Sequence, residues 1–423
     1  MASWVKAEIV STQQPDASRR AGLNRLYGFL PSSGRHYASN RNMDFGPDDR
    51  SNVSLLSGHL RHRLLLESEV LNTVVQRFAP STAEKFIQEI FWRGYFKGWL
   101  EQHPSGWTTY RRDVMRLVAD LGRSEDLASR YQKAIDGNTG IACFDAWSRE
   151  LVETGYLHNH ARMWFASIWI FTLQLPWQLG ADYFFRHLID GDPASNTLSW
   201  RWVGGLHTVG KTYLAQPDNI ERYTAGRMNA RGQLATSAQP LTESTKHPRQ
   251  QLRPVSELAY TDKAALLITE EDARLEDLFI GQKPVAGIAL LATAARSPLP
   301  VGEVAGGFAR AAMEDAATRA GEHFGLSIRD PIDAEDWGLL LCNFATSAGV
   351  TAFVTSYAPV GPVSEKLDRA RSLLIDRGIS LVEEKRAYDE LSWRHATRGF
   401  FALKKKIPQI LEELQRMDAP KLI

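Results

Sequence analysis

The sequence predicts two domains of different class, an all-helical domain followed by an α/β domain. Up to about residue 230, apolar residues recur at helical spacing and no period-two strand stands out. The stretch 231–260 is rich in Gln, Ser, Thr and Pro, which is typical of a linker. Beyond it, short apolar runs alternate with helical stretches in a βαβ pattern. We therefore expect an all-helical domain at 1–230, a linker at 231–260 and a Rossmann-like, doubly wound parallel α/β domain at 261–423.

Local patterns predict the individual elements in chain order. Ser81 and Glu84 match a capping box, which predicts the start of the helix that carries Phe86. Short apolar runs in the second half predict buried parallel strands. The expected helices are 17–30, 67–101 with a break at Pro80, 111–121, 125–135, 144–153, 162–175, 180–189, 303–323 and 364–377, and the expected strands are 264–268, 285–292, 338–342, 351–355 and 379–382.

Composition limits the class of protein. A net charge of +1 excludes a globally basic chain, so any nucleic-acid site must be a local patch. Cys143 and Cys342 are too few for a disulfide framework or a four-cysteine cluster. The apolar stretch 163–177 is too short to span a bilayer, and the first residues lack the apolar core of a signal peptide. We therefore expect a cytoplasmic monomer without a metal site or a membrane segment.

One short segment carries an unusual density of chemically useful side chains. Asp190, Asp192 and Asn196 are followed at once by Trp200 and Trp202. Acids in this arrangement can accept hydrogen bonds from a ring or a sugar, and indoles can stack on planar groups or carry an electron. The same pattern also fits a helix cap beside two core tryptophans, so the residues alone leave both interpretations open.

The segment from Asp190 to Trp202 closely resembles the flavin-contacting segment of the DNA photolyase and cryptochrome family. Four further stretches resemble motifs of that family and follow in the family's order, across roughly residues 16–225. They are Tyr37 to Asn42, Ser54 to Ser57, Glu89 to Arg93, and His158 to Met163. The departures are Val53 for a threonine, Phe86 for a frequent tryptophan, Gly94 for a glutamate and His160 for an arginine.

The resemblance implies a role for each matched residue. The cofactor is FAD, whose diphosphate the helix start at Ser54–Ser57 would hold, while Arg162 would pair with Asp190 and Asn196 would face flavin N5. The residues implied in repair are Glu89, Trp92, Met163, Asn196 and Trp202. Those implied in binding FAD are Tyr37, Ser54, Leu55, Leu56, Ser57, Phe86, Asn159, Arg162, Asp190, Gly191, Asp192 and Asn196. Those implied in contacting DNA are Arg41, Arg93, His160 and Lys211.

The family's electron relay is matched in part. Trp200 and Trp177 have the spacing of its two inner tryptophans, and the outer position falls on Ala134. Tyr131 or another exposed aromatic residue would have to replace the outer member.

The second half resembles the family's light-harvesting α/β domain in pattern and order, although that domain normally comes first. Glu270 and Glu271 replace an arginine pair in its opening motif. The simplest interpretation is a circular permutation, and the alternative is an unrelated Rossmann-like domain. An antenna chromophore is possible, but no Gly-x-Gly-x-x-Gly loop or arginine pair supports one.

The implied function is that of a deoxyribodipyrimidine photolyase, a carbon–carbon lyase that repairs cyclobutane pyrimidine dimers in damaged DNA by electron transfer from light-excited reduced FAD. A cryptochrome-like blue-light photoreceptor that binds FAD without repairing DNA is the main alternative. A light-independent flavin-binding or structural protein is the third, and it would leave the Trp200–Trp177 relay idle.

Overall fold

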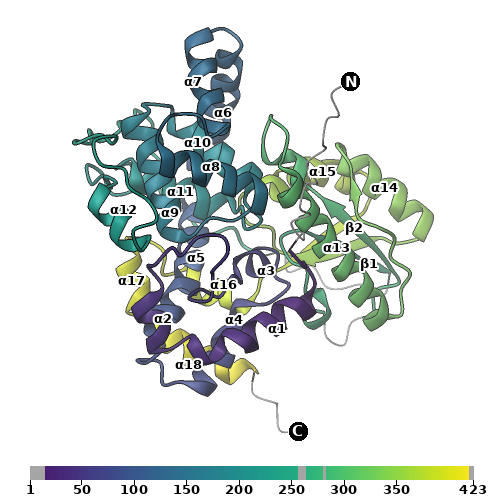
Figure 1. Ribbon diagram of the computed structural model, residues 1–423. Helices are drawn as coiled ribbons and strands as arrows, with labels where there is room; N and C mark the ends of the chain where they lie inside the picture. Colours follow the sequence, from purple (N-terminus) through teal and green to yellow (C-terminus); the bar gives the residue numbers. More distant parts are fainter. Residues whose placement is uncertain (1–14, 256–262, 280–282, 419–423) are drawn as a thin grey trace, which may run out of the picture.

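The computed structural model describes residues 15–255, 263–279 and 283–418. The first half is helical, and a parallel sheet with flanking helices lies beside it (Figure 1). The helices of the first half are α1 (Arg19–Phe29), α2 (Arg35–Asn40), α3 (Ser57–Arg61), α4 (Glu67–Arg77), α5 (Glu84–Gln102), α6 (Ser105–Leu121), α7 (Glu125–Ile135), α8 (Ala142–Thr154), α9 (Asn159–Ser167), α10 (Trp177–His187), α11 (Pro193–Val203) and α12 (Pro217–Tyr223).

Side-chain caps fix several of these helix starts. Ser18 accepts a hydrogen bond from the amide of Ala21 at the start of α1, and Ser124 does the same at the start of α7. The capping box expected at Ser81 and Glu84 is not formed, because α5 begins at Glu84 after Ala83 and has no side-chain cap. The Glu84 carboxylate instead pairs with Lys404, 3.0 Å away.

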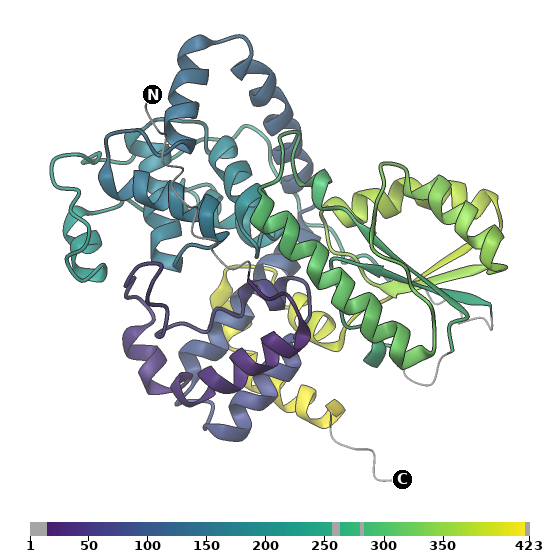
Figure 2. The ribbon, with the colours of Figure 1, turned by 45° about the vertical axis from the view of Figure 1, so that its right-hand side comes forward.

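The second half contains a five-stranded parallel sheet in the order β3–β2–β1–β4–β5. Its strands are β1 (Ala264–Thr269), β2 (Ala286–Leu291), β3 (Ile332–Asp333), β4 (Ala352–Ser356) and β5 (Ser380–Glu384). Alternate residues of β1 enter two separate cores, with Leu266 on the side of α13 (Glu303–Phe324) and Leu267 on the side of α14 (Trp337–Ala348) and α15 (Pro362–Asp376). The sheet is therefore covered by helices on both faces (Figure 2).

One expected strand is wrong, and one observed strand was not predicted. The stretch 338–342 lies inside α14, whose N-cap Asp336 accepts from the amide of Leu339. Trp337, Leu341 and Ala345 recur at helical spacing in the core, and a short apolar run cannot by itself distinguish a buried helix from a buried strand. The two-residue strand β3 is exposed and was missed because it has no apolar pattern.

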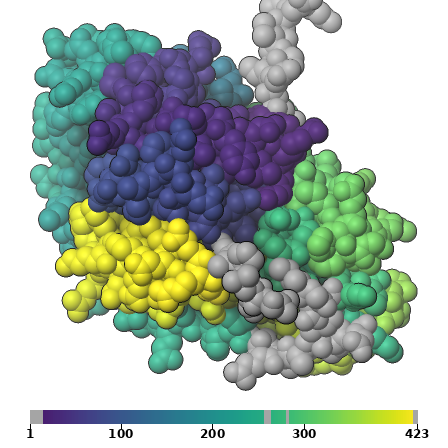
Figure 3. Space-filling model, turned by 90° about the horizontal axis from the view of Figure 1, so that it is seen from below, coloured from purple at the N-terminus to yellow at the C-terminus, as the bar shows by residue number. Residues whose placement is uncertain are grey.

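The last helices leave the sheet and complete the core of the helical half. They are α16 (Ala387–Trp393), α17 (Phe400–Lys404) and α18 (Ile407–Asp418). Leu391, Leu403 and Leu414 share one hydrophobic cluster with Val70 of α4 and Phe91 of α5. Figure 3 shows these C-terminal residues, in yellow, against the blue segment that contains α4. By packing, the part of the chain expected as the end of the α/β domain belongs to the helical half.

Glycines on α5 allow α16 to approach closely. A Cβ atom on Gly94 would lie 2.6 Å from the hydroxyl oxygen of Tyr388, and one on Gly98 would lie 2.7 Å from the Cα atom of Trp393. Both distances are too short for a methyl group. A glycine at position 94 thus allows α5 and α16 to approach this closely without displacing Tyr388.

The segment 231–255 contains no helix or strand; most of its contacts are with the helical half, and Arg253 near its end contacts Tyr357 and Glu383 of the sheet half. The amide of Gln250 donates to the carbonyl of Gln102, and Glu243 pairs with Arg201 at 2.6 Å. Residues 256–260 of the expected linker lie outside the described residues. The described part is therefore a fixed strap along the surface.

Buried ion pairs join the two halves. Glu271 of the sheet half lies 2.7 Å from Arg61 and 3.6 Å from Lys97, all at most 3% exposed. Burial opposes ionisation, but these cations hold the pKa of Glu271 below its usual value. Arg63 contacts both carboxylate oxygens of Asp389 at 2.7 Å. Glu271 thus faces two cations across the interface, whereas the Glu270 carboxylate accepts a hydrogen bond from Thr293 within the sheet half.

Candidate functional site

Aromatic side chains from α2 and α5 form one wall of the expected cofactor site. Tyr37 and Phe86 meet edge to face with ring centroids 5.2 Å apart, and Phe29 contacts both rings. Burial raises the pKa of the Tyr37 phenol, so this hydroxyl stays protonated at neutral pH. The wall can pack against a flat ring while offering a single hydrogen-bond donor.

Glu89 follows Phe86 by one turn of α5. Its side chain is 35% exposed and forms an ion pair with Arg41, which is 26% exposed. Burial nevertheless raises the pKa of Glu89, and the nearby Arg41 opposes that shift. The Glu89 carboxyl is therefore partly exposed and partly desolvated by the surrounding protein atoms.

Trp92 does not present a free ring face. The ring of Phe400 in α17 stacks on it, with centroids 3.7 Å apart and planes inclined by 10°. Phe400 is itself 4% exposed. The family resemblance implies a role for Trp92 in repair, but in this conformation a pyrimidine dimer cannot stack on the covered face of its ring. The reason is the docking of the C-terminal helices on α5.

The helix start expected to hold the cofactor's diphosphate lies at α3. Ser57 is the first residue of that helix, and its hydroxyl oxygen is buried without a hydrogen-bond partner among the described residues. The Ser54 hydroxyl accepts a hydrogen bond of 3.4 Å from the amide of Leu56, which is buried, while Leu55 has a φ of 52°. An orphaned buried hydroxyl is costly, so Ser57 is suited to a polar ligand.

The expected pair between Arg162 and Asp190 is present. Nη2 of Arg162 lies 3.0 Å from Oδ2 of Asp190, and Nε of Arg162 donates to the carbonyl of Leu157. The other carboxylate oxygen of Asp190 is buried and has no partner among the described residues. Arg162 thereby fixes Asp190 with one acceptor oxygen free for a ligand donor.

Asp192 serves the structure rather than a ligand. One carboxylate oxygen caps α11 by accepting from the amide of Ser195 at 2.7 Å, and the other lies 3.5 Å from Arg93 and 3.7 Å from Lys97. Burial opposes ionisation, but the two cations hold the pKa of Asp192 well below its usual range. Both oxygens are engaged, so the expected contact to the cofactor is not supported at this residue.

Two further expectations near Asp192 also change. Arg93 is 12% exposed and points inward to Asp192, so it does not face an open surface where DNA could lie. Gly191 is a packing residue, because a Cβ atom there would lie 2.9 Å from the carbonyl oxygen of Phe185. Its own carbonyl accepts a hydrogen bond of 2.8 Å from Arg61.

Asn196 and Trp200 lie one turn apart on α11. The amide nitrogen of Asn196 donates to the carbonyl of Ala181 at 2.7 Å, which fixes the orientation of its side chain. Trp200 is 2% exposed and contacts Phe184 and Trp169, with ring centroids 5.2 and 6.2 Å away. The buried indole is held rigidly beside the amide.

The ring contacts of Trp200 lead towards Trp169 and then Tyr131. The Trp169 and Tyr131 centroids are 6.1 Å apart, whereas Trp177 stacks on Tyr110 at 5.8 Å. Tyr131 is 6% exposed, so it is not the exposed aromatic residue that was expected. Trp169 was not predicted as a site residue, because it lies in an apolar stretch that is typical of a buried core. The ring contacts in the structure identify Trp169 as the aromatic neighbour of Trp200.

The remaining expected site residues differ in exposure and contacts. His160 lies between Trp164 and Tyr223, and burial lowers its pKa, so it contributes little positive charge towards DNA. Trp202 stacks on Tyr213 with centroids 5.6 Å apart. Asn159 and Lys211 are exposed and Met163 is half-buried. Within the described part of the chain, no cluster of three or more His, Cys, Asp or Glu residues could hold a metal ion, and no helix is long and apolar enough to cross a membrane.

These elements form a helical flavin-binding unit. Residues 86–225 match the family described as the FAD binding domain of DNA photolyase.

Individual relatives agree with that match. The chain is 31% identical over 194 residues to the mitochondrial deoxyribodipyrimidine photo-lyase of Saccharomyces cerevisiae, covering 44% of this chain and 34% of the yeast protein. It is 32% identical over 166 residues to the deoxyribodipyrimidine photo-lyase of Streptomyces griseus, covering 38% and 35%. The chain thus spans about a third of the length of these two relatives.

Two solved structures are also similar over part of the chain. A class III photolyase from Agrobacterium tumefaciens is 25% identical with a TM-score of 0.42, covering 53% of this chain and 49% of that chain. A cryptochrome from Synechocystis is 24% identical with a TM-score of 0.41, covering 49% and 43%.

Proposed function

We propose that this protein is an FAD-dependent photolyase that splits cyclobutane pyrimidine dimers in DNA under light. The observation that carries the proposal is the position of Glu89, a partly exposed carboxyl one turn along α5 from the Tyr37–Phe86 wall. Its raised pKa keeps a larger fraction of the carboxyl protonated than in a free glutamate. A protonated carboxyl can donate a hydrogen bond to a pyrimidine carbonyl and stabilise charge that develops there.

The residues present fit FAD. The free hydroxyl of Ser57 suits a phosphate oxygen, the free oxygen of Asp190 suits a ring or ribose donor, and the Tyr37–Phe86 wall suits a flat ring. The oxygen atom of the Asn196 side chain accepts no hydrogen bond from any described residue and can accept one from a reduced flavin. When bound and reduced, FAD supplies the electron that splits the lesion and receives it back.

The other residues act by binding and orientation. Arg162 would hold Asp190 in place and balance its charge beside the ring. Trp200, through Trp169, would restore reduced cofactor from outside the site. Lys211 is exposed and would meet a DNA phosphate, and Trp202 and Met163 would border the extruded lesion.

Light-dependent repair of a single defined thymine dimer tests this proposal. The purified protein is expected to carry FAD and, after reduction, to repair the dimer only in blue light. Glu89→Gln cannot ionise but keeps a donor, so it is expected to retain more repair than Glu89→Ala. Purified protein without FAD, or a reduced holoprotein that repairs nothing, would refute the photolyase assignment.

We also propose that the domain order reflects a circular permutation. The first and last described helices support it, because Leu26 of α1 and Ile410 of α18 share one hydrophobic cluster. A relinked chain that starts at Lys263, joins Ile423 to Met1 through a short flexible linker and ends at Val255 is expected to fold and bind FAD like the original. If that chain does not fold, the permutation proposal is wrong.

One observation favours a second function, that of a photoreceptor without repair activity. Phe400 covers one face of Trp92, so this face is not available for a lesion to stack on. Under this alternative, FAD binds and is photoreduced, but a thymine dimer is neither bound in preference to undamaged DNA nor repaired.

A further inference from the structure

The segment 391–411 is strongly basic. It contains five lysines and arginines and neither an aspartate nor a glutamate, although the whole chain is nearly balanced at a net charge of +1. This basic segment lies outside the residues 86–225 that match the photolyase family. A local concentration of cations in a nearly neutral protein indicates an anionic partner.

Contacts with α5 fix the course of the basic segment. The carbonyl of Trp393 accepts a hydrogen bond of 2.9 Å from the side-chain amide of Gln102, the last residue of α5. Phe400 stacks on Trp92 near the middle of that helix, and Lys404 pairs with its first residue at 3.0 Å. The basic segment therefore runs antiparallel to α5 and accompanies it from end to end (Figure 1).

Four of the five cations are exposed and unpaired. Among the described residues, none forms an ion pair or a hydrogen bond with the side chain of Arg394, Arg398, Lys405 or Lys406. Lys404 differs, because it is half-buried against the α5 carboxylate that it pairs with. The charge of the four exposed side chains is therefore available to a ligand in solution.

The length of the basic segment matches the backbone of one DNA strand. The helix α5, which it accompanies, has 19 residues. At a rise of about 1.5 Å per residue this helix is about 28 Å long. One strand of a DNA duplex carries a phosphate about every 3.4 Å of helix axis, so about eight phosphates pass over this length. Cations spread along it can each meet a different phosphate.

The basic segment borders the candidate site. Glu89 lies one turn before Trp92, and the ring of Phe400 covers one face of that tryptophan. The ring centroid of Tyr95 is 5.9 Å from that of Phe400, and the Tyr95 hydroxyl lies 3.0 Å from Nε2 of His207. The loop that contains His207 also carries the exposed lysine proposed for a DNA phosphate. A continuous set of contacts therefore joins the basic segment to Glu89 and to this loop.

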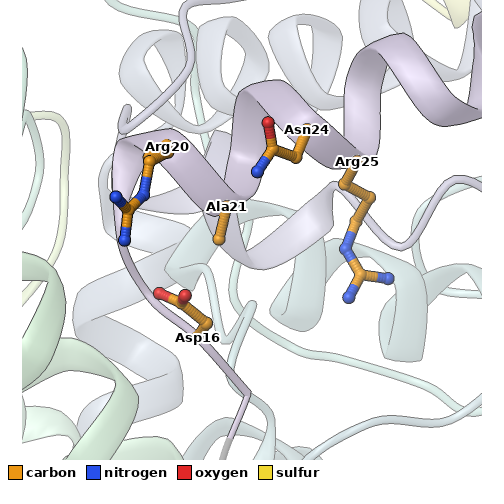
Figure 4. Close-up of a pocket in the computed structure, with 5 residues that line it drawn as sticks. All are labelled: Asp16, Arg20, Ala21, Asn24 and Arg25. Atoms are coloured by element: carbon orange, nitrogen blue, oxygen red, sulfur yellow. The ribbon is translucent and has the colours of Figure 1, made fainter.

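A cavity of about 550 Å³ beside α1 also contains arginines that form no ion pair with a described residue. It is lined by Asp16, Arg20, Ala21, Asn24 and Arg25 (Figure 4). The carboxylate of Asp16 shares this cavity with the two arginines and offsets part of their charge. The basic segment has no acid of its own, so it is better suited to a polyanion.

We propose that Arg394, Arg398, Lys405 and Lys406 bind the phosphates of the DNA strand beside the lesion. This inference rests on the proposed function, because it takes damaged DNA as the substrate. Phosphate contacts carry no sequence information, so they increase the affinity for damaged and undamaged DNA alike. They also supply positive charge that Arg93, which is turned inward, does not present to DNA.

Fluorescence anisotropy with a labelled, undamaged DNA duplex at several salt concentrations tests the inference. The triple substitution Arg398→Gln/Lys405→Gln/Lys406→Gln should make the slope of log affinity against log salt less steep by about 2.7, since each lost phosphate contact removes about 0.9. The affinity at about 0.1 M salt should fall about 10-fold or more. Arg398→Gln and Lys405→Gln alone should each change the slope by about 0.9, so the test does not depend on the folding of the triple variant.

Two controls separate this surface from a general effect of charge. Arg112→Gln/Arg116→Gln/Arg123→Gln removes three charges from exposed arginines of α6 and the turn after it, which project from the body of the molecule (Figure 1). This variant should bind DNA as the wild type does. Lys404→Gln removes a cation that is already paired, so it should weaken DNA binding less than Lys405→Gln does. Bound FAD and the melting temperature should be unchanged in all these variants.

Four other outcomes would overturn the inference. If the wild type repairs the dimer and the triple variant of the basic segment keeps the wild-type affinity and salt slope, the inference is wrong and the proposed function stands. If the α6 variant loses as much affinity, the effect is one of net charge. If the triple variant keeps its affinity for DNA but no longer binds phosphatidylserine vesicles that the wild type binds, the basic segment binds an anionic lipid surface. If the wild type binds no DNA, the inference fails together with the proposed function.

Discussion

Replacing Phe400 with leucine should increase the affinity for a pyrimidine dimer. The change keeps an apolar side chain in the core but removes the flat ring that stacks on Trp92 at 3.7 Å. An aromatic pair of this kind contributes about 0.5–1.5 kcal/mol beyond its buried area. If the lesion must displace the ring, loss of that contribution increases the population of the open state, and the affinity should rise about 2- to 12-fold.

Fluorescence anisotropy with a labelled oligonucleotide that carries one thymine dimer measures this effect. The undamaged oligonucleotide should show little change, because the lesion alone would stack on the uncovered Trp92 face. Phe401→Leu is the matched control, since Phe401 is the next residue, is 73% exposed and does not stack on Trp92. An unchanged or lower affinity of a folded Phe400→Leu protein for the dimer would refute the reasoning. It would show that the stack on Trp92 does not oppose lesion binding.

Three further predictions concern the relay, the pH dependence of stability and the helix contact at α5. Trp169→Phe should slow photoreduction of bound FAD, followed by its absorbance in blue light, more than Trp177→Phe does; the opposite order would favour the family's usual path. Burial raises the pKa of Glu150 from 4.5 to about 7 against the effect of Arg50, so its contribution to stability is full below pH 4.5 and is lost as the pH rises through 7. Denaturant unfolding of Glu150→Gln at several pH values should therefore show a smaller decrease over this range than the wild type, and parallel curves would contradict the assignment. Gly94→Ala should lower the free energy of unfolding by about 1–3 kcal/mol, because the new methyl group meets the hydroxyl of Tyr388. The loss should be smaller in a Tyr388→Phe background, and equal losses in both backgrounds would mean that α5 and α16 separate instead.

Local sequence patterns were enough to predict the helices and strands that depend mainly on neighbouring residues in the chain. The β1 and β2 strands lie in short, almost wholly apolar runs, so they could be recognised as buried strands. The expected strand at 338–342 failed because burial of α14 against the sheet produces the same apolar run. The packing of α16–α18 on α5 could not be inferred, since it joins residues about 300 positions apart and leaves no local pattern.

The site was predictable where a motif determines a pairwise contact. Arg162 and Asp190 are 28 residues apart and still pair as the resemblance implied. The roles of Asp192 and Arg93 could not be predicted from a motif, because each role depends on which buried charged side chains pack against the residue. Lys97 and Glu271, which complete that environment, have no motif of their own. The stacking of Phe400 on Trp92 could not be predicted for a related reason, because Phe400 lies in the other half of the sequence.

The position of the C-terminal helices also has a consequence for synthesis. Arg63 pairs with Asp389, which lies 326 residues further along the chain and is therefore synthesised later. At a translation rate of about 5–20 residues per second, the ribosome needs roughly 16–65 s to reach that partner. During this interval Arg63 and the apolar face of α5 remain without the side chains that bury them. The helical half, although made first, should therefore reach its final state last, and nascent chains stalled before Tyr388 are expected to be the ones that chaperones retain.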